Sequence, residues 1–394
     1  MVANSDLKFK RILVVKLADF GDALLVEPAL RALHNTYPAA RLDVLTTKSG
    51  LPALERLPYL HQVMLLDKYR FDKPGTTFEP TSLSLGLALG WQLLRARYDV
   101  VIFFHHLTTR WGALKFAGLA LATLAPLRAG LDNHTGRAWF LNHTLPDGGF
   151  GEAGISEREY WLRLANTLGG ASEPQARAEA ERPQFVINQA ERQYADNQLE
   201  QLRATHPDAP IVMLYPGSGP YSLSRRWLPL RFAQVGDALF EKWGAQIVIL
   251  GSQAEVEVAA QIQSLMHHPA TILAGRTTLY QAGALLARCN LFIGNDGGLM
   301  NLAAAMGAPT IAIFGPTNAQ AWQPFGLARG KSIIVQAEAN LPCRPCLYRG
   351  KELGKRYGCA PRPCLTQISA EEVIAAANRL LQNGAKLNLI KSVE

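Results

Sequence analysis

The sequence lacks long apolar runs. The longest one in these 394 residues, at positions 111–127, contains Lys115 and ends beside Pro126, so it is shorter than the roughly 20 residues that a membrane span needs. We expect it to form a buried or surface-lying helix. The N-terminal residues MVANSDLKFKRILVV also lack the apolar core of a signal peptide, because Lys16 and Asp19 interrupt the run. These absences predict a cytoplasmic protein.

Low-complexity tracts, short internal repeats and nucleic-acid-binding motifs are also absent, and nothing in the sequence predicts a nucleic-acid partner. With 48% hydrophobic and 18% charged residues, the composition is that of a globular protein. The formal net charge of +8 suits anionic partners such as nucleotides, phosphorylated glycans or the inner membrane leaflet. The same charge is equally compatible with a role in solubility alone.

The length favours two domains, and strand-like and helix-like segments alternate along both halves. Short apolar runs typical of buried parallel strands lie at 12–15, 42–45, 63–66 and 100–104, and again at 211–214, 247–250, 271–273, 291–293 and 310–314. Helical segments between them include 23–34, 230–242, 254–266 and 279–287. The pattern predicts an α/β protein with parallel sheets covered by helices on both faces.

The boundary between the N-terminal and the C-terminal strand-and-helix segments lies at 169–184, which is polar and has no strand character. A polar helix is expected after it, at 189–205. We therefore predict domains at 1–183 and 184–394. Two doubly wound domains facing each other would direct the carboxyl ends of their strands, and their ligand sites, toward an interdomain cleft.

Residues 291–317 carry the clearest site signal. A strand is followed by the Gly/Asn/Asp-rich turn 294–298 and then by a helix, whose free N–H groups and dipole favour a phosphate or diphosphate. Gly297 and Gly298 leave the backbone accessible, and Asp296 lies in the same turn.

A second phosphate-binding candidate lies at 215–232. Gly217 and Ser218 belong to a turn after a strand, where backbone amides can meet an anion. Arg225 and Arg226 follow, and guanidinium groups bind phosphate oxygens bidentately. The structural alternative is a solvated arginine pair.

Two carboxylates allow two interpretations each. Asp22 follows the first strand, where it is either a helix N-cap or a general base, with Asp19 as the rival base in the same loop. Glu255 follows the strand at 247–250, where it either contacts ribose hydroxyls or stabilises the first turn of a helix.

The chain has only five cysteines, and we expect Cys289 to be an inert buried thiol. The other four have a spacing that suits a structural zinc site, but we favour reduced, unliganded thiols over zinc, and disulfides come last in a reducing compartment. These four are Cys343, Cys346, Cys359 and Cys364.

Taken together, these segments resemble glycosyltransferase family 9, the ADP-heptose:lipopolysaccharide heptosyltransferases. The resemblance spans about residues 11–373 and rests on RILVVKLADFGDALLVEPALRAL, SRRWLPLRFAQVGDAL, ILGSQAE and GNDGGLMNLAAAMGAPTIAIFGPTN. It implies the GT-B fold, with two facing Rossmann-like domains, the N-terminal one for the acceptor and the C-terminal one for a nucleotide-sugar donor. It also implies inversion at the anomeric centre and no obligatory metal.

By position, the resemblance makes Asp22 the base that deprotonates the acceptor hydroxyl, in preference to an N-cap. Arg225 stands where the family usually has a lysine at the leaving diphosphate, and Glu255 where an acidic residue meets the donor ribose. Asp296, Gly297 and Gly298 match an Asp-Thr-Gly turn that holds the donor. The chain departs from the family at Gly297, which lacks the usual hydroxyl, and at Asn301, where histidine is common.

The sequence therefore predicts a glycosyltransferase that moves a sugar, heptose by resemblance, from a nucleoside diphosphate to a glycan or glycolipid such as a lipopolysaccharide core. The alternatives are a nucleotide-sugar epimerase of the same layout and a non-catalytic nucleotide-sugar or glycan-binding protein, which Asn301 suggests. A lipid-linked anionic acceptor would bring the protein into salt-sensitive peripheral contact with the membrane.

Overall fold

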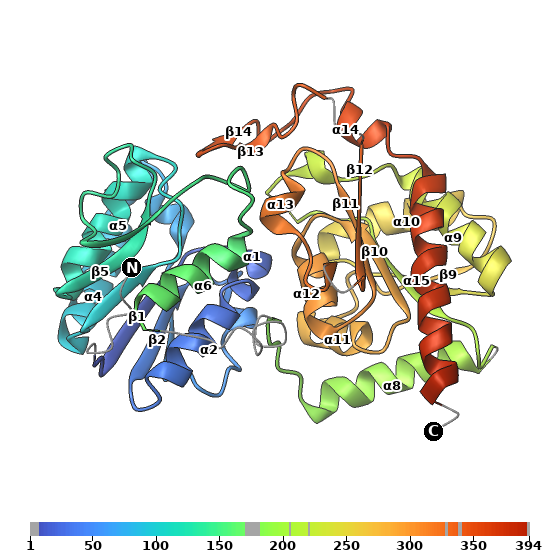
Figure 1. The fold of residues 1–394 in the computed structure, drawn as a ribbon, viewed down its shortest axis with the longest axis horizontal. Coiled ribbons are helices and arrows are strands. Elements are labelled where there is room, and N and C mark those ends of the chain that lie inside the picture. Colours follow the sequence, from blue (N-terminus) through green and yellow to red (C-terminus); the bar gives the residue numbers. More distant parts are fainter. Residues whose placement is uncertain are drawn as a thin grey trace. The chain divides into compact units, whose positions relative to one another are not determined.

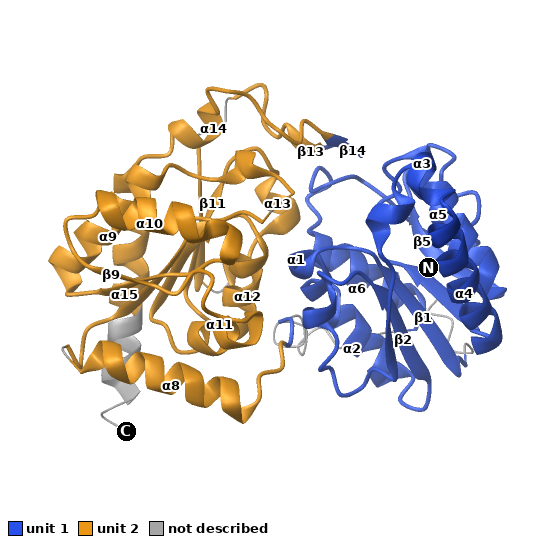
Figure 2. Ribbon diagram, turned by 180° about the vertical axis from the view of Figure 1, so that it is seen from behind, with its two compact units in different colours: residues 1–184, 349–353 blue, residues 185–348, 354–394 orange. Residues whose placement is uncertain are grey.

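The computed structural model describes residues 8–169, 182–204, 206–219, 221–327, 330–337 and 341–391. The chain divides into two compact units, residues 1–184 with 349–353 and residues 185–348 with 354–394 (Figure 2). The predicted join at 169–184 lies mostly outside the described residues. Each unit is a parallel α/β sheet with its own core.

The first unit is built on a six-stranded parallel sheet in the order β3-β2-β1-β4-β5-β6 (Figure 1). Its strands are β1 (Arg11–Lys16), β2 (Arg41–Thr46), β3 (Gln62–Leu65), β4 (Val100–Phe103), β5 (Leu127–Asp132) and β6 (His143–Pro146). Its helices are α1 (Phe20–Leu24), α2 (Glu27–Thr36), α3 (Pro74–Thr77), α4 (Pro80–Ala96), α5 (Arg110–Thr123) and α6 (Glu157–Thr167), with the 3₁₀ turns η1 (Leu51–Ala53) and η2 (Lys68–Phe71).

Successive side chains of β1 point to opposite faces of the sheet, so the apolar core of the first unit has one part on each face. Leu13 and Val15 of β1 pack in one buried cluster with Leu93 of α4 and Phe116 of α5. The other pair of long helices, α2 and α6, packs together.

The second unit repeats this topology in the order β12-β11-β10-β7-β8-β9, again entirely parallel. Its strands are β7 (Ile211–Tyr215), β8 (Gln246–Ile249), β9 (Ala270–Ile272), β10 (Leu291–Asn295), β11 (Thr310–Phe314) and β12 (Ser332–Gln336). Its helices are α8 (Gln189–Arg203), α9 (Pro229–Trp243), α10 (Val256–Leu265), α11 (Leu279–Leu286), α12 (Gly298–Met306), α13 (Ala319–Trp322), α14 (Pro363–Thr366) and α15 (Ala370–Lys391), with the 3₁₀ turns η3 (Leu223–Arg225) and η4 (Gln253–Glu255).

A small two-stranded sheet, β13 (Leu347–Arg349) and β14 (Glu352–Gly354), lies between α13 and α14 in the chain. Its tip, residues 349–353, belongs to the first unit. There the backbone N–H of Phe150 donates to the carbonyl of Gly350 at 2.9 Å, and Lys351 Nζ donates to the carbonyl of Asn133 at 3.1 Å.

Both sheets have the strand order of a doubly wound fold, in which ligands bind where the order reverses. In the first unit this switch point lies between β1 and β4, and in the second between β7 and β10. The loops that follow these four strands therefore carry the expected sites.

The α/β class and the two parallel sheets confirm the fold predicted from the sequence. The predicted strands are present within a residue or two of their predicted ends, whereas β5, β6, β12, β13 and β14 were not predicted. The predicted helix at 23–34 is two helices, because α1 ends at Leu24 and α2 begins anew at Glu27 with Pro28 in its first turn.

The N-cap alternative for Asp22 is wrong. Asp19 occupies the N-cap position of α1, and Asp22 lies within the first helical turn.

The apolar segment 111–127 forms most of α5 and the first residue of β5. Leu124 ends the helix in a left-handed conformation, with φ 50°. Among the described residues, none of the helices has the length and apolar character needed to cross a membrane.

Candidate functional site

Asn295, the last residue of β10, joins the two loops at the switch point of the second unit. Its side-chain amide donates to the carbonyls of Pro216 at 2.8 Å and Gly217 at 3.1 Å. The side-chain oxygen Oδ1 of Asn295 accepts the backbone N–H of Trp227 at 3.0 Å. The phosphate-binding candidates that are far apart in sequence, 216–227 and 295–298, therefore form one site.

The third loop of this site, which follows β8, packs so closely on position 217 that only glycine fits there. A Cβ atom at this position would lie 2.5 Å from Glu255 Oε1 and 2.6 Å from the ring of Tyr215. The neighbouring Ser218 is buried, and its hydroxyl donates to the carbonyl of Ser222 at 2.9 Å. The β7 loop is therefore fixed against the β8 loop.

Arg225 and Asp296 form an ion pair across the site. Arg225 Nη1 lies 3.5 Å from Asp296 Oδ2, and Arg225 Nη2 donates to the carbonyl of Ser218 at 2.6 Å. The hydroxyl of Thr317, after β11, donates to the same carboxylate oxygen at 2.8 Å. Asp296 thus orients the guanidinium of Arg225, because both groups are largely buried.

Arg226 and Glu255 form a second, similar pair at 3.3 Å. The other oxygen of Glu255 accepts the backbone N–H of Ser252 at 2.8 Å and its hydroxyl at 2.7 Å, which completes a capping box around η4. The structural interpretation of Glu255 is therefore confirmed, and the same carboxylate also holds one of the candidate arginines.

Helix α12 begins at Gly298, with Gly297 as its N-cap and Asn301 buried in its first turn. Gly297 has φ 174° and ψ −179°, an extended conformation open to any residue. A Cβ atom there would make ordinary contacts, 3.4 Å from the Tyr215 ring and 3.6 Å from Ser218 Cα. Glycine at 297 is therefore not required by the fold, in contrast to Gly217.

In the first unit, the loop after β1 holds Asp22 and Asp19 in different surroundings. Asp19 accepts the hydroxyl of Ser49 at 2.8 Å and lies 3.4 Å from Lys68 Nζ. Asp22 acts electrostatically on Lys16, the last residue of β1. The two candidate bases therefore differ, since Asp19 pairs with Lys68 and Asp22 acts electrostatically on the buried Lys16.

Lys16 is a functional candidate that the sequence interpretation missed. It is buried, and its Nζ lies 4.3 Å from the ring centroid of Trp161. Burial lowers the pKa of the Lys16 ammonium, while the carboxylates of Asp22 and Glu157 act in the opposite direction. Its signal in the sequence was a cation directly after the apolar run Ile12–Val15.

The two histidines after β4 were also missed. Burial, with Lys16 next, lowers the pKa of His105 well below its usual value, and its Nε2 accepts the backbone N–H of Leu17 at 2.6 Å. His106 lies between two buried carboxylates, with Nδ1 2.9 Å from Asp147 and Nε2 2.9 Å from Glu157. Burial opposes its charge, but these carboxylates prevail and raise the pKa of His106 to about 9.

The four clustered cysteines are free thiols, Cys343 and Cys359 exposed, Cys346 half-buried and Cys364 buried. Burial raises the pKa of Cys364 to about 11, and the other three thiols add to the shift, so all four share one neighbourhood. Within the described residues, however, no three His, Cys, Asp or Glu side chains are arranged to hold a metal ion. The zinc alternative therefore has no supporting geometry among these residues.

Cys289 is buried as predicted. Its thiol donates to the carbonyl of Leu286 at 3.3 Å, and burial raises its pKa to about 12. At that pKa it stays protonated and inert at neutral pH.

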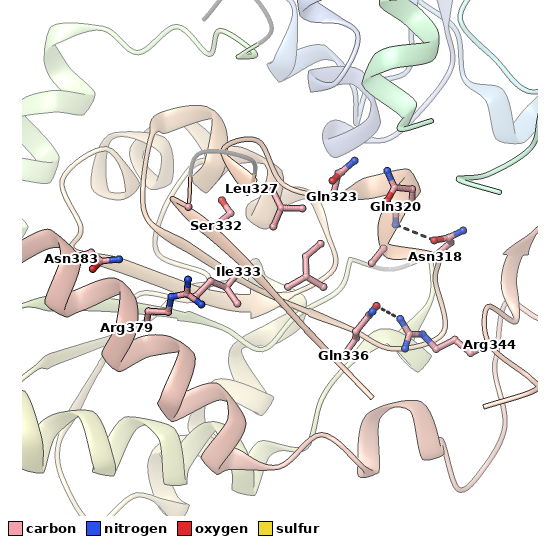
Figure 3. Close-up of a pocket in the computed structure, with 13 residues that line it drawn as sticks. Asn318, Gln320, Gln323, Leu327, Ser332, Ile333, Gln336, Arg344, Arg379 and Asn383 are labelled. Carbon is pink, nitrogen blue, oxygen red and sulfur yellow. Dashed lines mark hydrogen bonds between the residues drawn. The ribbon is translucent and has the colours of Figure 1, made fainter. Parts of the chain in front are cut away.

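A pocket of about 600 Å³ lies elsewhere in the second unit, beside the edge strand β12 (Figure 3). Its wall includes Arg344, bonded to Gln336, and Arg379 of α15. Because none of the predicted site residues lines it, this pocket is separate from the switch-point loops.

The fold and these loops define the class: two Rossmann-like, doubly wound units, with two largely buried arginine–carboxylate pairs and a helix N-terminus at the loops where such folds bind nucleotides. Comparison with protein families matches residues 87–356 to glycosyltransferase family 9 (heptosyltransferase). The chain therefore belongs to glycosyltransferase family 9 and is a glycosyltransferase, as predicted.

Individual relatives are distant but extensive. Lipopolysaccharide heptosyltransferase 2 of Escherichia coli (strain K12) is 24% identical over 322 residues, which cover 78% of this chain and 83% of the relative. A family 9 glycosyltransferase from Veillonella parvula has a TM-score of 0.71 at 21% identity, covering 96% of this chain and 99% of that one. E. coli heptosyltransferase WaaC with ADP has a TM-score of 0.66 at 19% identity, covering 94% and 99%. At such identities the structural likeness supports the fold.

Proposed function

We propose that this protein transfers heptose from ADP-heptose to a sugar hydroxyl of a lipopolysaccharide core acceptor. The family, the relative named a lipopolysaccharide heptosyltransferase and the fold shared with an ADP-bound heptosyltransferase support this choice. The observation that carries it is the joining of the β7 and β10 loops by Asn295, which brings Arg225 and Asp296 together at the switch point.

The donor diphosphate lies, in this proposal, against Arg225, Arg226 and the N-terminus of α12. Two guanidinium groups and the free N–H groups of a helix start are suited to an anion. Gly217, Ser218, Gly297, Gly298 and Asn301 complete the walls in this proposal, and Glu255, which pairs with Arg226, is proposed to meet the donor ribose.

The reaction requires a base and a stabilised leaving group. Asp22 takes the proton from the acceptor hydroxyl, whose oxygen bonds to the anomeric carbon on the side opposite the diphosphate. The bond from that carbon to the diphosphate oxygen breaks and leaves its electron pair on ADP, so the anomeric centre is inverted. The two arginines and the α12 N-terminus stabilise the charge that grows on ADP in the transition state.

The acceptor belongs, in this proposal, to the N-terminal unit, where Asp22 follows β1. A lipopolysaccharide core is anionic and lipid-linked. An acceptor of this kind fits the net charge of +8 and would bring the enzyme into peripheral contact with the inner face of the membrane.

Incubation with labelled ADP-heptose and a deacylated core oligosaccharide tests the proposal. Release of ADP with an extended oligosaccharide supports it. An altered sugar without transfer indicates an epimerase, and binding without turnover indicates a non-catalytic protein, the outcome that Gly297 and Asn301 would explain. UDP-sugars tested in parallel establish whether the donor was assigned correctly.

Zinc remains a separate hypothesis for the four cysteines, and no step of the reaction passes through it. Metal analysis of purified protein, compared between the wild type and a Cys343→Ser/Cys346→Ser variant, tests it. One equivalent of zinc that disappears in the variant would support a site.

A further inference from the structure

Helix α4 of the first unit carries large apolar side chains on its outside. Of its 17 residues, only Ser82 and Leu93 are buried, while Leu87 is 76% and Trp91 57% exposed. Helices of globular proteins normally turn such side chains toward the core. The exposed residues also include Leu83, Leu85 and Leu94.

The neighbouring helix α5 extends this surface. Leu121 is 60% and Leu124 71% exposed, and Leu114, about two turns before Leu121, is exposed as well. The two helices lie side by side along one edge of the first unit (Figures 1 and 2), with a Cβ at Gly90 only 3.9 Å from Ala122. The α4–α5 face is defined here by its exposed apolar residues: Leu83, Leu87, Trp91, Leu94, Leu114, Leu121 and Leu124.

Basic residues predominate on this segment, and the carboxylates beside it are Glu79, exposed at the N-cap of α4, and Asp72, which lies 2.6 Å from Lys115 Nζ. Between Pro80 and Arg128 the sequence has five basic residues and a single acidic one, Asp99. Asp99 is already engaged, because its Oδ2 accepts the backbone N–H groups of Lys10 and Arg11 at 2.6 and 2.9 Å.

Three of the basic residues are exposed at the ends of the two helices. Arg95 and Arg97 lie at the end of α4, and Arg110 at the start of α5. Arg95 also stacks on Trp91, with its guanidinium carbon 4.6 Å from the ring centroid. An apolar surface with a tryptophan, arginines at its margins and no acidic residue on either helix has the chemistry of a membrane-surface contact.

We propose that the α4–α5 face docks on an anionic lipid bilayer, with Leu87, Trp91 and Leu121 entering the headgroup region. Arg95, Arg97 and Arg110 then meet lipid phosphates. The proposal deepens the acceptor part of the proposed function and rests on it, since a lipid-linked acceptor places the enzyme at a membrane. A protein partner is the alternative occupant, because protein interfaces are also enriched in tryptophan and arginine, and it is an outcome of the test below.

Flotation of the full chain with vesicles tests the docking. Wild type should float with phosphatidylglycerol-containing vesicles at low salt, less at high salt, and much less with phosphatidylcholine alone. Leu87→Ser/Trp91→Ser should reduce binding about tenfold or more, as expected for apolar groups that no longer leave water. Arg95→Gln/Arg97→Gln/Arg110→Gln should reduce it about fivefold per arginine and flatten the salt dependence.

Matched controls lie on exposed positions of the second unit. Leu265→Ser on α10 and Arg203→Gln on α8 change the same residue types, both exposed, and should float as wild type does. Thermal melting of every variant checks folding. Absence of wild-type binding to both vesicle types, or equal binding by the Leu87→Ser/Trp91→Ser variant, would overturn the proposal.

Two further measurements separate this inference from its alternatives. If sedimentation shows a wild-type dimer that Leu87→Ser/Trp91→Ser converts to a monomer with unchanged vesicle binding, the face is a protein interface and the proposal is wrong. Transfer to a deacylated, water-soluble acceptor should be equal in wild type and this variant. If wild type floats as expected but transfers to no acceptor, the docking stands and the proposed function fails.

Discussion

His106 Nε2 lies 2.9 Å from Glu157 Oε1, and this contact joins the loop after β4 to the first turn of α6. Charges of alternating sign extend from it in both directions. Asp147 lies beyond His106, and Lys16 is influenced by both Glu157 and Asp22. The candidate base Asp22 is therefore linked electrostatically, through Lys16, to a set of buried charged side chains at the carboxyl edge of the first sheet.

His106 should make the stability of the protein depend on pH in the alkaline range. Its pKa of about 9 in the folded protein exceeds the ordinary value of about 6.5, so its charge stabilises the fold below pH 6.5. This stabilisation is lost as the pH rises through about 9. His106→Gln should cost about 3 kcal/mol at pH 6, since it leaves Asp147 and Glu157 without their cation.

Urea unfolding of both proteins at pH 6, 8 and 10 measures this difference. The gap between wild type and His106→Gln should narrow at pH 10, because wild-type His106 is then neutral. A gap that stays constant across this range would show that the imidazole contributes packing and not charge.

Lys16 should set the pH range in which Asp22 works as a base. Lys16→Met removes the cation beside Asp22, which makes protonation of Asp22 easier. The acidic limb of the kcat/KM profile should therefore move to higher pH, and activity near neutrality should fall. Lys16→Arg keeps the charge and should move the limb less. A purely structural role for Lys16 would lower activity at every pH without moving the limb.

The sheets were predictable because buried parallel strands appear as continuous apolar runs, as in β1, β7, β10 and β11. The strands that escaped prediction have weaker patterns. β5 contains Arg128 and ends in Asp132, and β6, at the sheet edge, alternates between half-buried and exposed residues. β12 does carry an apolar run, Ile333–Val335, so its omission was an error of interpretation.

The candidate site was predictable only in part. Loops after β7 and β10 have turn residues and arginines that indicate anion binding, and the structure brings them together. Asn295 and Thr317 were missed because their roles depend on partners far along the chain, Gly217 and Asp296. His106 was missed for the same reason, since Asp147 and Glu157 lie 41 and 51 residues away.

Arg225→Ala should weaken ADP binding about tenfold or more, the scale of a lost charge-assisted hydrogen bond. The loss should shrink at high salt, where screening weakens the attraction. Arg225→Lys keeps the charge but loses the forked guanidinium that reaches both Asp296 and Ser218. Its affinity for ADP should therefore lie between those of the wild type and Arg225→Ala. Calorimetric titration with ADP at low and high salt measures this, and unchanged affinity in both Arg225→Ala and Arg226→Ala would remove this loop from the donor site.

A small side chain added at Gly297 should strengthen ADP binding, whereas one added at Gly217 should weaken it. Gly297→Ser fits the extended backbone and the open surroundings, and its hydroxyl can donate to the donor diphosphate. ADP affinity should rise a few-fold, about the value of one hydrogen bond. Gly217→Ala should reduce affinity, because its Cβ meets Glu255 and the Tyr215 ring. Calorimetry on both variants compares them, and weaker binding by Gly297→Ser would place the diphosphate elsewhere.

Asp22→Asn should slow transfer by about two orders of magnitude or more, the usual effect of losing a general base. Its ADP affinity should change little, because the donor loops belong to the other unit. Asp19→Asn is the matched control. It keeps a hydrogen-bond acceptor for Ser49 but loses the ion pair with Lys68, so it should cost stability and spare most of kcat. Steady-state kinetics with a water-soluble acceptor distinguish the two, and near-normal kcat in Asp22→Asn together with a large loss in Asp19→Asn would assign the base to Asp19.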